Sequence, residues 1–398
     1  MSYLKVIIMK KISVLQVNKL YYPFIGGVES VVQYIAEGLK DTTNMCVLTC
    51  TEKGPTVDET VDGVQVCRTS SIGMYGNMPI SLSLPRTLRK MAPSYDILQF
   101  HMPFPIGDIA GLLSGYHGKI VVWWHSDIVK QKKLMILYKP FMELFLKRAD
   151  KIIVATQGHI EGSKYLKPYR DKCVVIPFGI QQDVEKSAAI YIHNKKQNTD
   201  DITYSIERKE EEKTVQFLFV GRLVYYKGCD ILVEAITRLK KLTTKNVKVN
   251  IVGTGPMSDE LHEMVRKNNL MNHINFLGKL TREELLKQYE ECDVFVLPSV
   301  ARSEAFGIVQ IEAMAYGKPV INTNLDSGVP YVSIHKETGL TVEPGNPDAL
   351  AGAMAYMIEN DKERLMMGDR ARRRVEENYQ MEHMLAKLLS LYEELLKH

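Results

Sequence analysis

Residues 303–319 read SEAFGIVQIEAMAYGKP and follow an apolar run, VFVL, that ends in Pro-Ser. Glu304 and Glu312 stand eight positions apart, with Gly307 between them. We expect a helix to begin near Phe306 or Gly307, which places Glu304 in the loop before it and Glu312 about a turn and a half inside. Free N–H groups and the macrodipole make a helix N-terminus an anion site. A carboxylate beside a phosphate would repel it unless the carboxylate serves another part of the ligand, such as sugar hydroxyls. The stretch therefore predicts a sugar-nucleotide site, although alone it also fits a capping carboxylate followed by an amphipathic helix.

Length and composition set the frame for this stretch. The chain has 398 residues, 45% hydrophobic and 25% charged, which predicts two domains that each bury a core. The net charge of +4 is too small to argue for a nucleic-acid partner. Six scattered cysteines without a CxxC favour a reducing cytoplasm and argue against a structural zinc site. We read no membrane-spanning run and no signal peptide, and we expect residues 1–8 to precede the fold.

The first half of the chain alternates short apolar runs with helical patterns. Such alternation predicts a parallel sheet with crossover helices, in which ligands lie beyond the carboxyl ends of the strands. Gly26 and Gly27 stand between the first strand and the first helix, where glycine lets the backbone approach a phosphate. An ordinary tight turn explains the glycine pair as well. The strands are expected at 12–17, 45–49, 64–68, 97–101, 120–124, 152–155 and 174–176.

Two histidines are expected at strand ends in this half. His125 follows the apolar run VVWW and begins the sequence HSD. A histidine there can donate to a sugar hydroxyl or sense a leaving phosphate, because its pKa is adaptable. A histidine that is merely hydrogen-bonded at the end of a strand is the alternative. His101 has the same placement with less support.

Basic and apolar residues are mixed between residues 128 and 146, in the sequence IVKQKKLMILYKPFMELFL. A helix of this composition could lie on an anionic membrane surface. A buried crossover helix with a solvated lysine end explains the segment nearly as well.

The second half repeats the pattern of the first after a polar stretch, residues 183–213, which we interpret as a surface linker or insertion. Arg222 and Lys227 flank a strand-to-helix turn. The planar guanidinium of arginine and the compact ammonium charge of lysine together suit a diphosphate. Gly253 follows the next strand, and the sequence Gly278-Lys279-Leu280 follows the one after. These strand ends are expected to line one cleft.

At this point the chain resembles the retaining family-four glycosyltransferases with a GT-B fold. The resemblance covers nearly the whole length, and the E-x7-E element is its specific motif. Residues 322–333 also look like bacterial members that build O-antigen or capsule polysaccharide, including mannosyl- and rhamnosyltransferases. The other matching motifs are YYPFIGGVE (21–29), HSDI (125–128), PFGI (177–180), GRLVYYKG (221–228), VGTGP (252–256) and ETGL (337–340).

The resemblance implies a fold and a role for each site residue. The fold is α/β, GT-B, with two Rossmann-like domains whose parallel sheets face each other across a cleft. The N-terminal acceptor-side domain is residues 1–182, the linker 183–213 and the donor domain 214–377, and residues 378–398 form a helix that crosses back to the N-terminal domain. By this resemblance Glu304 would contact the donor sugar, Glu312 the ribose, and His125 the sugar at the reacting centre. Arg222 and Lys227 would bind the diphosphate, Gly26 and Gly27 would close against the phosphates, and the backbone amides of Phe306, Gly307 and Ile308 would hold phosphate or sugar oxygens. Gly278, Lys279 and Leu280 would lie against the base, and Gly253 would also line the donor site.

The expected activity is retaining transfer from a donor such as GDP-mannose or a UDP-sugar to a lipid-linked or oligosaccharide acceptor. No D-x-D sequence occurs in the chain, so we expect transfer without a metal or cofactor. The expected location is the cytoplasm, at the inner face of the plasma membrane. Two alternatives remain: an epimerase of similar fold that acts on the nucleotide sugar alone, and a non-catalytic sugar-nucleotide binding protein.

Overall fold

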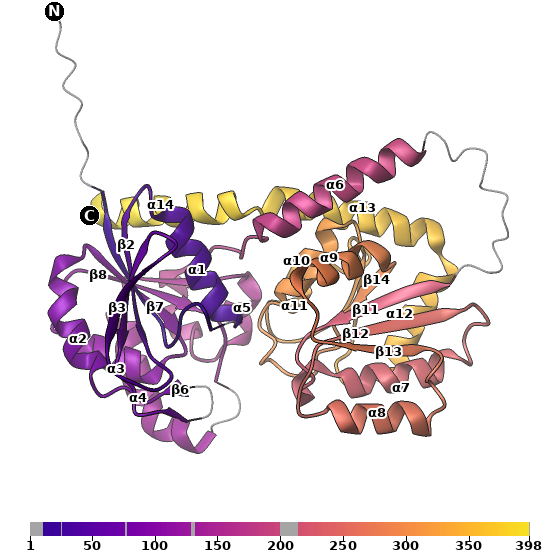
Figure 1. The fold of residues 1–398 in the computed structure, drawn as a ribbon, viewed down its shortest axis with the longest axis horizontal. Coiled ribbons are helices and arrows are strands. Elements are labelled where there is room, and N and C mark those ends of the chain that lie inside the picture. The colour runs from indigo at the N-terminus through magenta and orange to yellow at the C-terminus, as the bar shows by residue number, and fades with distance from the viewer. Residues whose placement is uncertain (1–10, 25, 76–77, 129–131, 200–213, 398) are drawn as a thin grey trace, which may run out of the picture. The chain divides into compact units, whose positions relative to one another are not determined.

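The computed structural model describes residues 11–24, 26–75, 78–128, 132–199 and 214–397, drawn in Figure 1. The chain forms two compact units. Unit 1 comprises Met1–Val154, Lys164–Ile176 and Leu385–His398, and unit 2 comprises Ala155–Ser163 and Pro177–Met384.

Unit 1 contains an eight-stranded sheet within its described residues, in the order β10-β9-β8-β7-β1-β2-β4-β3. All neighbouring strands are parallel except β3 and β4, which pair antiparallel. Every residue of β7 is buried, as expected for a central parallel strand covered on both faces. The strands are β1 (Ser13–Val17), β2 (Asn44–Cys50), β3 (Val57–Val61), β4 (Val64–Thr69), β7 (Ile97–Met102), β8 (Lys119–Trp124), β9 (Lys151–Val154) and β10 (Cys173–Val175), and a separate hairpin pairs β5 (Met74–Tyr75) with β6 (Met78–Pro79).

Helices cover this sheet, and their apolar residues recur at helical spacing. In α1 the buried residues Val31, Val32, Ile35 and Leu39 lie on one face, as the sequence predicts. The last helix, α14 (Met381–Lys397), belongs to unit 1 from residue 385 onward. The other helices are α1 (Gly27–Leu39), α2 (Leu84–Met91), α3 (Pro105–Leu113) and α4 (Lys132–Arg148), with short 3-10 turns η1 (Ala92–Ser94) and η2 (Lys167–Lys172).

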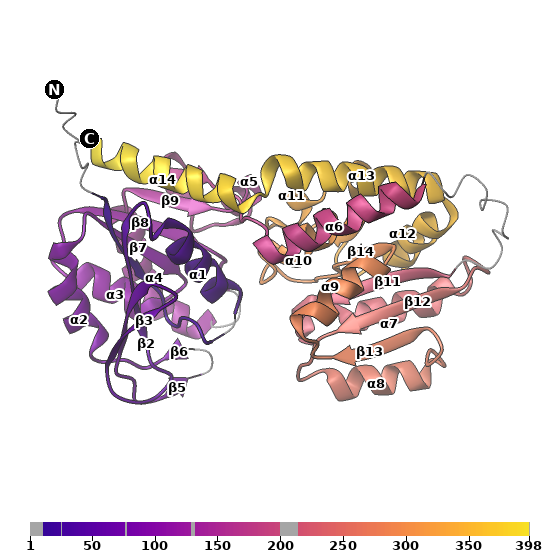
Figure 2. The same cartoon turned by 45° about the horizontal axis from the view of Figure 1, so that its top comes forward.

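Unit 2 contains a six-stranded parallel sheet within its described residues, in the order β13-β12-β11-β14-β15-β16. Helices α7 and α8 line one side of this sheet in Figure 2, and their apolar residues join those of the strands and of α12 in one core cluster. The elements are α5 (Gln157–Gly162), α6 (Gln182–Thr199), β11 (Val215–Val220), η5 (Tyr225–Lys227), α7 (Cys229–Leu239), β12 (Val247–Val252), α8 (Ser258–Lys267), β13 (Ile274–Gly278), α9 (Arg282–Glu291), β14 (Val294–Val296), α10 (Ile308–Ala315), β15 (Val320–Thr323), α11 (Val329–Val332), β16 (Gly339–Val342), α12 (Pro347–Glu359) and α13 (Asp361–Asn378).

The structure corrects the prediction for residues 183–213. Residues 182–199 form the helix α6, whereas 200–213 lie outside the described residues. Most side chains of α6 are polar, but Val184 and Ala188 form a narrow apolar stripe that is buried against the rest of unit 2. The stretch is therefore part of unit 2 as far as residue 199, and not an irregular linker.

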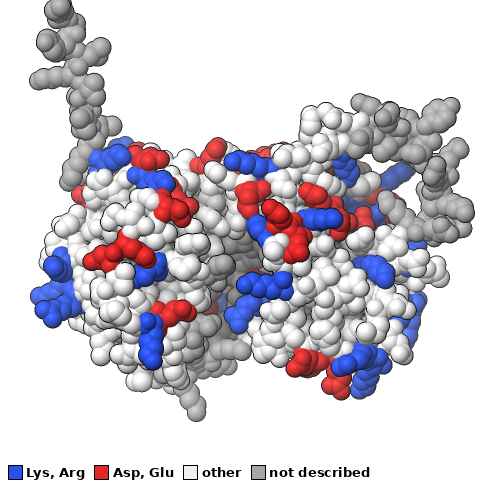
Figure 3. Space-filling view, viewed as in Figure 1, with Lys and Arg blue, Asp and Glu red and all other residues white. Residues whose placement is uncertain are grey.

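No helix within the described residues combines the length and the apolar character needed to span a membrane. On the face drawn in Figure 3, basic and acidic side chains are interspersed, and neither sign forms a continuous area. The six cysteines are all unpaired thiols.

Candidate active site

Glycines bring the loops at the carboxyl edge of the unit 2 sheet into backbone contact. Gly228 has φ +68°, and a Cβ on it would lie 2.0 Å from the carbonyl oxygen of Pro298. Gly253 has φ +129°, and a Cβ there would lie 2.0 Å from the carbonyl oxygen of Gly221. Only glycine fits both the dihedral angle and the space at these two positions. The turn after β11 therefore packs against the loops that follow β12 and β14.

This packing brings Lys227 to Glu304. The Lys227 ammonium lies 2.5 Å from Oε2 of Glu304, and both side chains are nearly buried. The Ser299 hydroxyl donates to the same oxygen at 3.1 Å. Burial alone would lower the pKa of Lys227, but the negative charge of Glu304 outweighs that effect and raises the pKa. The carboxylate and the ammonium thus form a charged pair at the sheet edge.

Other predicted site residues at this edge of the sheet are accessible to solvent. Arg222 and Lys279 are exposed, and Leu280 is half-buried. Gly278 ends β13 with φ +66°, and no described atom lies within 4 Å of the position that a Cβ would occupy. These residues can meet a ligand without displacing another part of the protein.

The second half of the E-x7-E element lies in α10, which starts at Ile308, one residue after Gly307, the later of the two predicted starts. Gly307 precedes it with φ +73°, and a Cβ there would lie 2.6 Å from Cδ2 of Leu297, so glycine is required. Phe306 is buried, and its ring meets Phe178 at 5.0 Å in an edge contact. Its side chain therefore anchors the loop, while the first turn of α10 carries the N–H groups that lack helical partners.

Glu312 lies inside α10 and is engaged on both carboxylate oxygens. Tyr289 donates to Oε2 at 2.7 Å, and Arg282 donates to Oε1 at 3.2 Å. Arg282 also donates to Asp183 from Nε at 2.7 Å and to the Gln181 side chain at 2.6 Å. Burial raises the pKa of Glu312, and Arg282 and Tyr289 oppose the rise. Arg282 thus ties the start of α6 to the second carboxylate of the motif.

Local sequence explains why Arg282 is held at this place. Thr281 caps α9 in a capping box with Glu284, whose side chain accepts from the Thr281 N–H at 2.8 Å. Arg282 is the first residue of α9, so its backbone position is fixed by the cap. The guanidinium is then oriented by the bidentate contact with Asp183.

Unit 1 carries the other predicted site residues. Gly26 is in extended backbone, and a Cβ on it would lie 2.2 Å from Oε2 of Glu29. Gly27 begins α1, and no described atom lies within 4 Å of its Cβ position. His125 follows β8, is buried, and contacts His101 at 2.9 Å between Nε2 and Nδ1. A side chain at position 26 would therefore require the Glu29 carboxylate to move, whereas Gly27 leaves backbone accessible.

Comparison with known proteins decides the family. Residues 25–184 match Glycosyltransferase Family 4, and residues 200–374 match Glycosyl transferases group 1. The O-antigen chain mannosyltransferase C of Escherichia coli is 33% identical over 387 residues, which cover 96% of this chain and 99% of the relative. The chain belongs to the family-four glycosyltransferases.

Two further proteins are similar to this chain, one in sequence and one in fold. The D-rhamnosyltransferase WbpZ of Pseudomonas aeruginosa is 35% identical over 295 residues, covering 74% of this chain and 72% of the relative. The crystal structure of a glycosyltransferase from Rickettsia africae superimposes with a TM-score of 0.74 at 22% identity, covering 98% of this chain and 100% of that one. The predicted GT-B fold class is confirmed by these likenesses and by the two parallel sheets.

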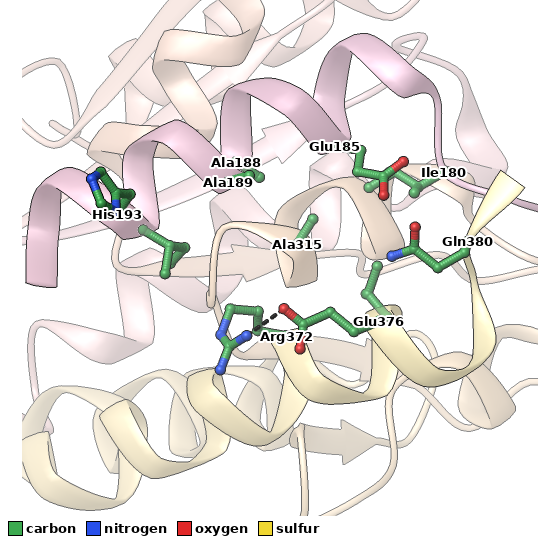
Figure 4. Close-up of a pocket in the computed structure, with 11 residues that line it drawn as sticks. Ile180, Glu185, Ala188, Ala189, His193, Ala315, Arg372, Glu376 and Gln380 are labelled. Atoms are coloured by element: carbon green, nitrogen blue, oxygen red, sulfur yellow. Dashed lines mark hydrogen bonds and ion pairs between the residues drawn. The ribbon is translucent and has the colours of Figure 1, made fainter. Parts of the chain in front are cut away.

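The glycosyltransferase also has a cavity of about 310 Å³ in unit 2, between α6 and α13. Figure 4 shows Arg372 and Glu376 of α13 joined across its lower side, with Glu185 and His193 on α6 opposite. None of the predicted site residues lines it. The described residues also contain no cluster of three or more His, Cys, Asp or Glu side chains arranged to hold a metal ion.

Several residues of the glycosyltransferase's site escaped the sequence analysis. Ser299 contacts Glu304, and Arg282 and Tyr289 contact Glu312, while Asp183 orients Arg282. Arg282 and Asp183 are 99 positions apart, so only the folded chain reveals the pair. Ser299 could have been found, because a serine that directly follows a buried strand and Pro298 lies at the ligand edge of the sheet.

Proposed function

We propose that this glycosyltransferase is a retaining, metal-independent hexosyltransferase. It moves a sugar from a nucleotide-diphosphate sugar to a lipid-linked or polysaccharide acceptor. The observation that carries the proposal is the group formed by Lys227, Glu304 and Ser299 at the carboxyl edge of the unit 2 sheet, with Arg222 exposed on the same turn. Ligands of parallel α/β sheets bind at this edge.

The chemistry of the leaving group explains the cations. An acceptor hydroxyl attacks C1 of the donor sugar from the face that the diphosphate leaves, so the configuration at C1 is retained. The bond between C1 and the phosphate oxygen breaks as the new glycosidic bond forms, and the departing phosphate takes the proton of the hydroxyl. Negative charge then grows on the nucleoside diphosphate, where Lys227, Arg222 and the N-terminus of α10 stabilise it. The absence of D-x-D from the sequence supports a reaction that relies on these cations.

The two carboxylates have separate roles in this proposal. Glu304 contacts hydroxyls of the donor sugar, because Lys227 and Ser299 already orient it. Glu312 contacts the ribose: each of its oxygens accepts one hydrogen bond within the protein, and a carboxylate oxygen has capacity for two. The segment 278–280 contacts the base. Gly26 and Gly27 approach the phosphates, and His125 contacts the sugar.

The relatives indicate the process. They are an O-antigen chain mannosyltransferase and a D-rhamnosyltransferase. We therefore propose a role in cell-surface polysaccharide synthesis, with GDP-mannose as the first donor to test and a UDP-sugar as the second.

A membrane-facing role for α4 follows from its exposed side chains. Ile136 and Leu137 are 76% and 75% exposed, and Phe141 and Leu144 are 45% and 56% exposed. Lys139 and Lys147 are also exposed, and Lys139 pairs with Glu143 at 3.4 Å, while the side chains of residues 129–134 lie outside those described. An apolar helix face flanked by lysines fits the interface of an anionic bilayer. We therefore place the enzyme on the cytoplasmic face of the plasma membrane.

Vesicle flotation tests this placement. The enzyme should float with vesicles of phosphatidylglycerol and not with pure phosphatidylcholine, and Leu137→Glu should abolish flotation. Leu242→Glu, at a 53% exposed leucine of unit 2, is the matched control and should float like the parent. Equal flotation of the parent and Leu137→Glu would refute the role of α4.

A ligand screen and a turnover assay test the main proposal. A nucleotide that binds only the folded protein raises its melting temperature, so GDP, UDP and their sugars should give distinct shifts. Release of nucleoside diphosphate should require the acceptor, should persist in EDTA, and should yield a product with the donor's anomeric configuration by NMR. Turnover without an acceptor would instead indicate an epimerase. A complete absence of thermal shifts would refute the nucleotide-sugar site.

A further inference from the structure

One face of the unit 1 sheet carries polar side chains in a core that is otherwise apolar. Gln16 of β1 pairs in register with Gln99 of β7, and His101 lies two positions further along β7. His125 follows the end of the neighbouring strand β8. All four are buried, with Gln16 and Gln99 fully so. Burying such groups is costly unless they are hydrogen-bonded, so their partners need an account.

The C-terminal helix supplies the missing partner. Tyr392 of α14 is fully buried and donates its hydroxyl to Oε1 of Gln99 at 2.6 Å. The Gln16 amide donates to the Tyr392 oxygen at 3.3 Å, and the Gln99 amide donates to Oε1 of Gln16 at 3.1 Å. These three side chains close a ring of hydrogen bonds between the sheet and α14.

The two histidines extend this ring toward the ligand edge. Nε2 of His101 lies 2.6 Å from Oε1 of Gln16, and Nδ1 of His101 lies 2.9 Å from Nε2 of His125. The Trp123 ring also stacks on both imidazoles. Its centroid lies 6.0 Å from that of each histidine, and the ring planes are 14° apart for His101 and 8° apart for His125. Both the planes and the contacts of the imidazoles are therefore set.

Donor and acceptor roles fix the protons along this path. The Gln16 amide nitrogen faces Sδ of Met45, which can only accept, so Oε1 is the atom facing His101. Nε2 of His101 must then carry the proton. Burial lowers the pKa of His101 to about 3, so the ring is neutral near pH 7 and its Nδ1 accepts. His125 must consequently donate from Nε2 to Nδ1 of His101.

One further contact agrees with this assignment. The Gln99 amide nitrogen lies 3.4 Å from Nε2 of His101. Both atoms carry protons in this scheme, so the contact is a van der Waals approach of two donors that share Oε1 of Gln16 as their acceptor. No member of the path is then left without a partner of the opposite kind.

We infer that Gln16, Gln99, His101 and Tyr392 form a buried relay that fixes the ring orientation and the Nε2–H tautomer of His125, and that Tyr392 is a positioning residue for sugar transfer. In the proposed reaction Nδ1 of His125 is the ring nitrogen that contacts a hydroxyl of the donor sugar, because Nε2 is engaged by His101. The catalytic half of this inference rests on the proposed role of His125 in the transferase reaction, whereas the tautomer does not.

Nitrogen-15 NMR of the histidine-labelled full chain tests the relay independently of activity. Neutral Nε2–H and Nδ1–H tautomers have different ring ¹⁵N shifts, and His125→Ala and His101→Gln identify the two signals. We expect the Nε2–H pattern for both residues, and a changed His125 pattern in Tyr392→Phe and in Gln99→Met. An Nδ1–H pattern for His125, or a pattern unchanged in both variants, would overturn the relay.

Kinetics test the catalytic half. Tyr392→Phe should lower kcat about tenfold, the loss expected for one oriented hydrogen bond, with little change in the KM for the donor. In a His125→Ala background, which retains residual turnover, the same change should have no further effect. Tyr116→Phe is the matched control, because it removes a tyrosine hydroxyl of the same unit that donates to the carbonyl oxygens of Tyr95 and Asp96 ahead of β7, and its kcat should match that of the parent.

The NMR and kinetic results together distinguish a failure of the relay from a failure of the proposed role of His125. Full activity of His125→Ala with the predicted tautomer would refute the role of His125 in the proposed function and leave the relay structural. A tenfold loss in Tyr392→Phe that persists in the His125→Ala background would show that Tyr392 acts by another route. Either result overturns the inference that Tyr392 positions His125 for catalysis.

Discussion

Replacing Lys227 with methionine tests the charged pair at the proposed donor site. The methionine side chain would keep most of the apolar stem but would leave the Glu304 carboxylate with the Ser299 hydroxyl as its described partner. The side chains of Lys227 and Glu304 are 13% and 9% exposed, so little water reaches the unpaired charge. Removing one partner of a buried pair costs about 3–5 kcal/mol. For a unit of this size that corresponds to a fall of roughly 10 °C in the melting temperature.

Adding Glu304→Gln to Lys227→Met separates folding from catalysis. The double variant buries no charge, and the amide oxygen can still accept from Ser299, so most of the lost stability should return. Activity should not return, because the cation that offsets the developing phosphate charge is absent. We expect kcat to fall by about 10²–10³ in both variants, the range for loss of one electrostatic stabiliser.

The assay must report on unit 2. Both tryptophans, Trp123 and Trp124, lie in unit 1, so their fluorescence would miss the change. Scanning calorimetry or far-ultraviolet circular dichroism is therefore required. Lys287→Met is the control: this lysine is 70% exposed and pairs with Glu291 at 3.7 Å, and its loss should cost less than about 0.5 kcal/mol. Equal stability of Lys227→Met and the control, or near-normal kcat, would refute the reasoning.

Three further predictions follow from single sites. Arg282→Met should raise the donor KM about tenfold while leaving kcat within about threefold, because the Glu312 carboxylate loses the arginine that holds it in place. An unchanged KM in initial-rate assays would contradict this. Burial raises the pKa of Asp108 to about 8, so the native state keeps a proton that the unfolded state loses between about pH 4 and pH 8, and stability falls over that window. At pH 9 the free energy of unfolding of Asp108→Asn, measured with urea and tryptophan fluorescence, should therefore exceed that of the parent by an amount on the order of 3 kcal/mol. At pH 4 the two proteins should have almost the same free energy of unfolding. Equal gains at both pH values would exclude titration of Asp108 as the cause. Gly228→Ala should destabilise unit 2 by at least about 2 kcal/mol in calorimetry, because a Cβ meets the Pro298 carbonyl at 2.0 Å and φ is +68°, whereas Gly352→Ala, where a Cβ meets nothing within 4 Å, should not lose stability.

The sequence predicted most of the sheets because a buried parallel strand is a continuous apolar run. The runs at 12–17, 97–101 and 120–124 became β1, β7 and β8 within a residue at each end. The antiparallel edge strand β3 was missed, because four of its five residues are exposed and no apolar run marks it. Helix α6 was missed for a similar reason: it buries only a narrow stripe, and its charged surface resembles a linker.

The candidate site was predictable where a motif is local and unpredictable where it is assembled. Glu304 and Lys227 each belong to a short pattern, and the fold joins them through the contact of Gly228 with the carbonyl oxygen of Pro298, a residue outside both patterns. Gln16 and Gln99 offered a signal that was not used, since a glutamine inside an apolar strand needs a partner. That partner, Tyr392, is 293 positions from Gln99, so no spacing rule connects them.

The two units stabilise their polar groups by opposite means, and the difference bears on function. Unit 2 keeps a charged pair, Lys227 and Glu304, although a buried ion pair contributes little stability relative to apolar residues of similar volume. Unit 1 keeps a chain of amides, imidazoles and a hydroxyl that are joined by hydrogen bonds. Stability alone requires neither arrangement. In the proposed reaction the charge of Lys227 offsets the leaving diphosphate and the hydrogen-bonded path orients the imidazole of His125, and each group lies near the carboxyl ends of the central strands of its own sheet.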